Sequence, residues 1–587
     1  MAEGAFFVGH VTLRMQVADD GHIGERLIAV RDPRRQVELV MFVPIKVEAK
    51  LPKVRRRVRP DVDDDVFDRP VLAAYDLRLT VTDPHVHAAH DAEQRLRRVV
   101  LRPMRGQARR GERCLVKRAM EPTTMVTMDN RNDEPNAVHR SGQNLHDNAQ
   151  STDDRLWQRL IDVYPVARSL TGHEVRATLA RVGRELAIDV HELPTGTEVL
   201  DWTIPDEWNL RRATLTAPDG RVVADTSVHP LHVVGYSESI DLDIDRDALE
   251  AHLFSLPDRP DAIPYRTSYY SRTWGFCITE RARQTLGPGT YHATIDATLA
   301  PGSLTYGEVV LPGASNREIL LTTHVCHPHM ANDNASGIAA LTEIGLRLAA
   351  REHRRHTVRL LYLPGSLGAI AWLATHRDVV PRITNGLVLT GLGNRGPLHY
   401  KRSRRGDTQT DRAAMVMLRD RGDDLCTQML EFSPYGYDER QFCSPGFDLA
   451  VGRLTRGVHG EYPEYHTSLD DLAFVDRASM HDAVTAIEAW VDIVERDETY
   501  ENLAPFGEPQ LGRRGLYRQL GGVLDARSME MAVLWVLNQA DGTNSLIDIA
   551  MRSRLPFHAI ADAADALVAA DLLAPIKSEE PRMAPRR

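Results

Sequence analysis

The sequence predicts an α/β protein whose main domain is a doubly wound, mostly parallel sheet. Three short apolar runs, "EILLTTHV", "TVRLLYLP" and "NGLVLTGLG", have the length and composition of buried strands. Two segments of helical character, "SGIAALTEIGLRLAA" and "AIAWLATH", lie between them. Strands that alternate with helices are joined by right-handed crossovers, which build a parallel sheet with helices on both faces.

The composition limits the class of protein. With 587 residues the chain is too long for one ordinary core, so we expect two to four domains. A net charge of -10 argues against a general nucleic-acid-binding protein. We expect no membrane association, because the N-terminus lacks a secretion-signal pattern and no apolar run approaches the roughly 18 residues of a membrane span. The five cysteines are widely spaced and odd in number, which fits a cytoplasmic protein without a disulfide framework.

The chain before and inside the main domain has further predicted parts. Residues 1–119 alternate apolar and polar residues in segments such as "VELVMFVPIKVEA", which predicts an additional β-rich N-terminal domain, although its role is not indicated. Residues 120–154 are polar and lack periodicity, as is typical of a linker. Residues from about 194 to 241 read as a β-rich piece that precedes the strand and helix alternation.

The C-terminal segment, residues 512–578, reads as three helices with turns and resembles a winged helix. Such a fold raises the question of DNA binding, but the stretch from Met529 to Ala574 contains six acidic and only two basic residues. Its third helix carries two aspartates and no basic residue, whereas affinity for duplex DNA comes largely from neutralising phosphates. We therefore expect no nucleic-acid binding. A packing role, a homodimer contact or a contact with a partner protein through the N-terminal or C-terminal domain remains open.

The segment "LLTTHVCHPHMANDNASG" gathers residues that bind metals. His327 and Asp333 lie six positions apart in a loop that follows a predicted strand and leads into a helix. A hydrolytic zinc site needs about three imidazole or carboxylate ligands and one open position. His466, in "EYPEYHTSLDDL", is the best candidate for the third ligand, and His324 at the strand end is an alternative one. The ordinary alternative is that these are polar residues at strand ends.

Together with "YHTSLDDL", this segment resembles the aminopeptidase-like members of the zinc-dependent exopeptidase superfamily. The resemblance is closer to a bacterial family with an inserted β subdomain and a C-terminal winged helix, and it extends over "YPVARSLTG", "IPYRTSYYSRTWGFC" and "YDERQFCSPGFDL". It covers about residues 155–575. The resemblance implies an aminopeptidase-like α/β domain at residues 155–505 with an inserted β subdomain at about 195–250, and a zinc site at His327, Asp333 and His466. Asp470 or Asp471 is a candidate for orienting a ligand histidine from behind.

Two positions depart from the family pattern. The glutamate that serves these peptidases as general base is replaced by Gly365 in "LLYLPGSLG". A general base is typically worth about 10²- to 10⁴-fold in rate, and glycine has no group that accepts a proton. Asn394 stands where relatives often carry an aspartate that helps to hold a second metal. We therefore expect one zinc ion and no co-catalytic pair.

Asp438 and Glu439, in "YGYDERQF", are candidates for a replacement proton acceptor. The structural alternative for both is an ion pair with Arg440 or Arg456, since buried carboxylates are normally paired. The predicted function is a metallohydrolase that cleaves an amide or peptide-like bond in a small molecule. The alternative function is a catalytically degenerate scaffold that binds a ligand or partner protein. "SYYSRTWGFC" and "KRSRRG" could shape the substrate pocket, or they are core aromatics and a solvated basic loop.

Overall fold

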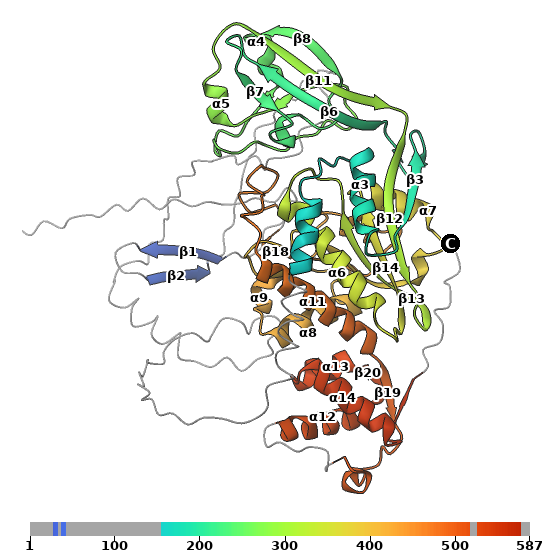
Figure 1. Ribbon diagram of the computed structural model, residues 1–587. Coiled ribbons are helices and arrows are strands. Elements are labelled where there is room, and N and C mark those ends of the chain that lie inside the picture. Colours follow the sequence, from blue (N-terminus) through green and yellow to red (C-terminus); the bar gives the residue numbers. More distant parts are fainter. Residues whose placement is uncertain (1–26, 33–36, 43–153, 459, 517–524, 577–587) are drawn as a thin grey trace, which may run out of the picture. The chain divides into compact units, whose positions relative to one another are not determined.

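The computed structural model describes residues 27–32, 37–42, 154–458, 460–516 and 525–576 (Figure 1). The chain divides into two compact units, Met1–Arg109 and Arg110–Arg587. In the first unit, β1 (Leu27–Asp32) and β2 (Val37–Phe42) form an antiparallel pair. The rest of the predicted N-terminal domain, residues 1–119, lies outside the described residues, and so does the predicted linker apart from residue 154.

The second unit is built on an eight-stranded sheet with the strand order β17-β16-β18-β15-β13-β14-β12-β3. The middle strands β18, β15, β13 and β14 run parallel to one another. β12 pairs antiparallel with β14 and β3, and β16 pairs antiparallel with β18. The bounds are β3 (Asp189–Pro194), β12 (Ser303–Leu311), β13 (Ser315–His324), β14 (His356–Leu363), β15 (Ile383–Leu389), β16 (Leu398–Lys401), β17 (Met429–Leu430) and β18 (Val451–Arg456).

Helices cover both faces of this sheet because successive strand residues point to opposite sides. In β13, Ile319 and Leu321 belong to the core that contains α6, whereas Leu320 belongs to the core that contains α7. This arrangement confirms the predicted doubly wound, mostly parallel α/β fold. The helices on the first face are α3 (His173–Val182), α6 (Gly337–Ala349), α8 (Gln409–Arg421) and α11 (Arg477–Arg496), and those on the second are α7 (Leu367–Thr375) and α10 (Glu439–Phe442).

An inserted antiparallel sheet with the order β7-β6-β11-β8 lies at one end of the α/β domain (Figure 1). Its strands are β6 (Glu207–Thr216), β7 (Val222–Asp225), β8 (Ile240–Asp245) and β11 (Thr290–Ala300). The sheet therefore extends past residue 250, since its fourth strand comes later in the sequence. The segment between β8 and β11 returns to the α/β domain, where the amide of Tyr265 donates to the carbonyl of His466 at 2.9 Å.

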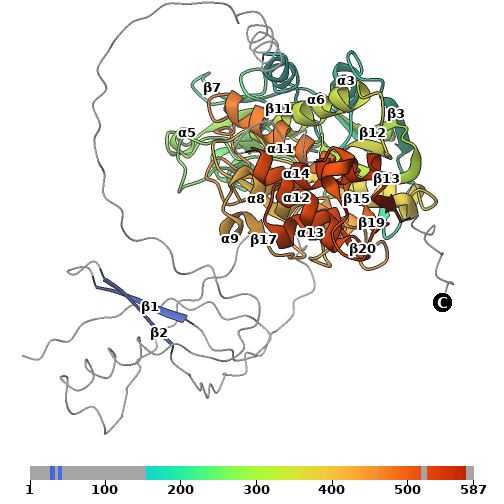
Figure 2. The same ribbon diagram turned by 90° about the horizontal axis from the view of Figure 1, so that it is seen from below.

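The C-terminal part combines three helices with a small sheet of order β20-β19-β21. Its elements are α12 (Asp525–Gln539), α13 (Leu546–Ser553), α14 (Phe557–Ala569), β19 (Thr499–Asn502), β20 (Asp541–Ser545) and β21 (Leu573–Pro575). Arg412 of α8 pairs with Asp548 of α13 at 2.5 Å, and the helices lie beside α8 and α11 in the view from below (Figure 2). Within the described residues, no helix has the length and apolar character needed to cross a membrane.

Candidate functional site

The predicted metal-binding loop begins where β13 ends, at His324, and leads through residues 331–336 into α6. The carboxylate of Asp470 accepts the backbone amides of Asn332 at 2.6 Å and of Asp333 at 2.8 Å. The side chain of Asn334 donates to Thr323 Oγ1 at 2.7 Å. Asp470 therefore anchors the backbone of the loop, a role different from the expected orientation of a ligand histidine.

The four predicted ligands come together around the Asp333 carboxylate. His324 Nε2 lies 2.8 Å from Asp333 Oδ1, and His466 Nε2 lies 3.2 Å from Asp333 Oδ2. His327 Nε2 lies 3.9 Å from Asp333 Oδ2. His324, His327 and Asp333 are buried, while the His466 side chain is 34% exposed. His466, which is 133 or more positions away in the sequence, therefore meets the other three residues at the carboxyl edge of the sheet.

The chemistry of these groups fits a divalent metal such as zinc. Asp333 Oδ2 and His466 Nε2 are buried atoms without a hydrogen-bond partner in the described part of the chain. Burial lowers the pKa of His327 well below its usual range, which leaves its imidazole neutral and able to act as a ligand. Despite burial, the neighbouring imidazoles hold the pKa of Asp333 well below its usual range. His324 contacts Asp333 Oδ1 and the Asn334 amide, and with His327 and Asp333 it forms a cluster whose ligand atoms lie within 4.8 Å of one another, so it stays an alternative ligand.

The space beside Gly365 is filled by a tyrosine. Gly365 follows β14, and a Cβ atom added there would lie 2.3 Å from the hydroxyl of Tyr437. The Tyr437 ring also packs against His324, with ring centroids 4.1 Å apart, and its hydroxyl lies 3.4 Å from Cys326 Sγ. Burial raises the pKa of Tyr437 well above its usual range, so the phenol is neutral. Gly365 is therefore the residue that admits this ring into the site.

The two candidate proton acceptors are fully buried beside the site. Glu439 accepts from Lys401 Nζ at 2.9 Å and from Arg453 Nη1 at 3.1 Å. These partners differ from the Arg440 and Arg456 named from the sequence. Both oxygens of Asp438 lack a hydrogen-bond partner among the described residues, and burial raises the pKa of this carboxyl to about 8. Neither carboxylate is among the described residues that line the cavity next to the metal-binding loop.

The side chain of Asn394, the residue considered above for a second metal, forms hydrogen bonds with backbone groups. Its Nδ2 donates to the carbonyl of Arg456 at 2.8 Å, and its Oδ1 accepts the amide of Gly396 at 2.7 Å. Both ends of the amide side chain are thus used in holding neighbouring loops. The number of metal ions stays a prediction.

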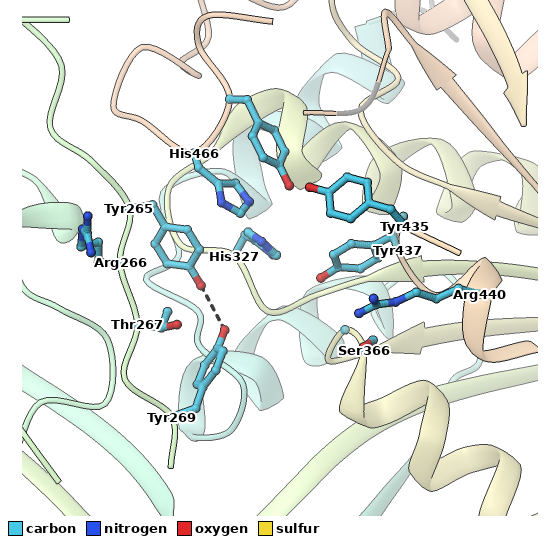
Figure 3. Close-up of a pocket in the computed structure, with 13 residues that line it drawn as sticks. Tyr265, Arg266, Thr267, Tyr269, His327, Ser366, Tyr435, Tyr437, Arg440 and His466 are labelled. Carbon is cyan, nitrogen blue, oxygen red and sulfur yellow. Dashed lines mark hydrogen bonds between the residues drawn. The ribbon is translucent and has the colours of Figure 1, made fainter. Parts of the chain in front are cut away.

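A cavity of about 290 Å³ opens next to His327 and His466 (Figure 3). Five tyrosines contribute to its wall: Tyr265, Tyr269, Tyr435, Tyr437 and Tyr465. The hydroxyl groups of Tyr265 and Tyr269 lie 3.3 Å apart, and the Tyr465 ring stacks on His466 with ring centroids 3.9 Å apart. The cavity thus joins the metal-binding groups to an aromatic, partly polar surface.

Sequence reasoning named the four residues that meet around Asp333 but missed most of the cavity. The "SYYSRTWGFC" segment does contribute Tyr269 to the wall. The "KRSRRG" loop does not reach it in the described structure, since Lys401 pairs with Glu439 and Arg404 pairs with Asp448. The available signal for Tyr437 was Gly365 itself, because a glycine in place of a large side chain leaves a volume that a neighbouring group must fill.

Comparisons with known proteins agree with this architecture. A family model described as a domain of unknown function, DUF4910, matches residues 157–497, and a winged helix-turn-helix model matches residues 498–575. A protein of Clostridium acetobutylicum, whose assigned name combines polysaccharide biosynthesis with an aminopeptidase-like domain, is 39% identical over 426 residues. That match covers 73% of this chain and 97% of the relative.

Solved structures give the same picture. A crystal structure from Clostridium acetobutylicum with a provisional peptidase name has 37% identity and a TM-score of 0.69, and the match covers 74% of this chain and 100% of that one. The zinc aminopeptidase BSAP of Bacillus subtilis has 13% identity to this chain and a TM-score of 0.44. That match covers 58% of this chain and 94% of BSAP. The resemblance to aminopeptidase-like proteins and the C-terminal winged helix are thereby confirmed. The chain belongs to the DUF4910 family.

Proposed function

We propose that this protein is a zinc-dependent hydrolase that cleaves an amide or peptide-like bond in a small molecule. The observation that carries the proposal is the pair of buried, unpartnered atoms Asp333 Oδ2 and His466 Nε2, which lie 3.2 Å apart beside the cavity. Two such groups left without a partner would each cost free energy, whereas a shared cation satisfies both. His327 completes a set of three ligands from imidazole and carboxylate groups.

A zinc ion held by His327, Asp333 and His466 would supply Lewis-acid activation of a carbonyl group and of water. The protein's own groups would do the rest. Tyr437 presents a neutral phenol to the cavity, and we assign it hydrogen-bond donation to the oxygen on which negative charge develops. The surrounding tyrosines bind the body of the substrate and exclude water from it.

The proton-accepting role expected for Asp438 or Glu439 finds less support than a structural one. Glu439 is occupied by two cations, and its second oxygen accepts the amide of Tyr437 at 3.0 Å. Asp438 holds its own proton at neutral pH. We propose that these residues fix the segment that carries Tyr437. Without a carboxylate base at the cavity, turnover should be about 10²- to 10⁴-fold slower than in peptidases that keep the glutamate.

The test is zinc-dependent hydrolysis by the purified full-length chain, measured on a panel of aminoacyl and N-acyl amide substrates. We expect turnover that a chelator abolishes and added zinc restores, and that His466→Ala reduces to background. The exposed substitution Asp201→Asn serves as the control and should leave turnover unchanged. Stable zinc binding without turnover on any member of the panel would favour the alternative, a scaffold that has kept the site but lost catalysis.

We also propose that the winged helix packs on the α/β domain and does not bind nucleic acid. Arg496 of α11 contacts Asp562 at 2.7 Å and Asp565 at 2.8 Å, and both aspartates lie on α14, the third helix of the unit. Acidic residues on that helix would repel a phosphate backbone. Fluorescence anisotropy with random duplex DNA at physiological salt should show no binding; a salt-sensitive rise in anisotropy would contradict this assignment.

A further inference from the structure

We propose that the cavity selects substrates with a free carboxylate, which Arg440 binds, and rejects substrates with a free amino terminus. This inference rests on the hydrolase function proposed above and names the substrate class of the same site. It runs against the specificity that the aminopeptidase-like fold would lead one to expect. The argument depends on the charges of the cavity wall and on the contacts of one arginine.

The cavity wall is not suited to a cationic group. None of the described residues that line it is an aspartate or a glutamate, whereas two, Arg266 and Arg440, are arginines. An ammonium group that leaves water needs a carboxylate or several oxygen acceptors in return, because an unpaired buried charge is costly. Three carboxylates close to the cavity are committed elsewhere. Asp333 contacts His324 and His466, Glu439 binds Lys401 and Arg453, and Asp438 is protonated at neutral pH.

Arg440 offers the opposite charge to a ligand. It follows Glu439 on α10, is exposed, and is in no ion pair within the described part of the chain. In Figure 3 its guanidinium extends toward the cavity between Tyr437 and Ser366. A guanidinium presents two parallel N–H groups that match the two oxygens of a carboxylate, and the Ser366 hydroxyl provides a further polar contact nearby.

The second arginine differs in its contacts. The guanidinium carbon of Arg266 lies over the ring of Phe254, 4.7 Å from its centroid, and the side chain stands at the edge of the group drawn in Figure 3. It is thus occupied by a cation–π contact with a residue that is not among the lining ones. One guanidinium therefore remains for the substrate, which balances the single charge of a carboxylate better than the double charge of a phosphate monoester.

The rest of the wall fits the body of such a substrate. Tyr265, Tyr269, Tyr435 and Tyr465 present aromatic faces and hydroxyl groups without a formal charge. Their rings can pack on an apolar or planar group while their hydroxyls meet its polar edges. An N-acyl amino acid or a related amide with a terminal carboxylate combines the two features, with its amide bond placed toward His327 and His466.

The experiment compares three matched probes at the zinc-loaded full-length protein: an N-acetyl amino acid, its carboxamide, and the corresponding amino acid amide with a free amino group. Each probe is prepared with several different amino acid side chains, because the cavity wall does not indicate which side chain the substrate carries. We expect kcat/KM to be at least about 10-fold higher for the carboxylate form. Arg440→Gln should remove this preference through KM with kcat largely retained, and Arg440→Lys should restore part of it. Arg404→Gln, which alters an exposed arginine outside the cavity, should change neither parameter.

A preference for the free-amino probe, or a carboxylate preference that survives Arg440→Gln, would overturn the inference. Calorimetric binding of the same probes separates this failure from failure of the proposed hydrolase function. If no probe is hydrolysed but the N-acetyl amino acid binds, and binds at least about 10-fold more weakly to Arg440→Gln, the carboxylate site stands without the catalysis. Equal binding of that probe to the wild type and to Arg440→Gln would show that the carboxylate is held elsewhere.

Discussion

The two sides of the site are built on different principles. On the metal-ligand side, imidazole and carboxylate groups from β13, the following loop and residue 466 converge and leave Asp333 Oδ2 and His466 Nε2 without partners in the described structure. On the opposite side, after β14, Gly365 is covered by the Tyr437 ring, and the carboxylate of Glu439 is closed off by Lys401 and Arg453.

This difference indicates which part of the chemistry has been kept. A buried group without a partner is costly to fold, so its presence points to a ligand that supplies the compensation. On the side of Gly365 and Glu439, no carboxylate is among the described residues that line the cavity. Glu439 is paired with Lys401 and Arg453, and the neutral phenol of Tyr437 fills the space beside Gly365. A substrate here would be activated by the metal and held by hydrogen bonds, with little help from a carboxylate base.

The largest expected effect on stability concerns the buried charges behind Tyr437. Lys401→Met removes one partner of Glu439, which is fully buried, and leaves its charge only partly compensated. We expect a loss of about 3 kcal/mol in the free energy of unfolding, measured by denaturant titration. Arg211→Ala breaks an exposed pair with Asp296 and should cost much less, because solvent screens exposed ion pairs. Equal losses in the free energy of unfolding for the two variants would mean that the buried pairing of Glu439 does not stabilise this region.

A smaller effect on stability tests whether substitutions at Gly365 and Tyr437 are energetically coupled. Gly365→Glu restores the side chain of the related peptidases, but its Cβ would overlap the Tyr437 ring, so we expect a loss of about 1–3 kcal/mol. Combining it with Tyr437→Ala should cost at least about 1 kcal/mol less than the sum of the two single changes, because the ring is then absent. Gly287→Glu, at a position with open space around it, is the control. Strict additivity would contradict the coupling.

The smallest effect depends on pH and on Asp438. Burial raises the pKa of this carboxyl to about 8, above the ordinary value of about 4 in an unfolded chain. The folded state therefore binds a proton that the unfolded state lacks, and its contribution to stability falls as the pH rises from about 4 to 8. Asp438→Asn should gain stability relative to the wild type as the pH rises across that range, because its amide does not titrate.

Denaturant titrations of Asp438→Asn at several pH values provide the measurement. Asp201→Asn, which changes an exposed carboxylate, should follow the wild-type pH dependence. A constant difference between Asp438→Asn and the wild type from pH 5 to pH 9 would show that Asp438 is ionised throughout and that its burial is compensated.

The fold and the convergence of the histidine and aspartate side chains could be predicted because their signals are local. The alternation of strands and helices defines the sheet, and the spacing of His327 and Asp333 in a loop after a strand indicates ligands at its carboxyl edge. Asp470 was noticed for its place near His466, but its actual contacts are with backbone amides of a loop more than 100 positions away. Contacts of that kind have no sequence pattern.

The cavity was harder to predict for the same reason. Tyr265 and Tyr269 come from a segment between two strands of the inserted sheet, and they reach the site because that segment pairs with residues 466–468. Tyr437 enters the site only because residue 365 has no side chain. Neither event leaves a periodic trace, since each depends on tertiary packing between distant parts of the chain.

The central claim is that one zinc ion is held by His327, Asp333 and His466, and metal content tests it most directly. Elemental analysis of the zinc-loaded, dialysed wild type should give about one zinc per chain, while Asp333→Asn should retain little or none and Asp201→Asn should match the wild type. Absence of zinc from the wild type, or an unchanged zinc content in Asp333→Asn, would contradict the account.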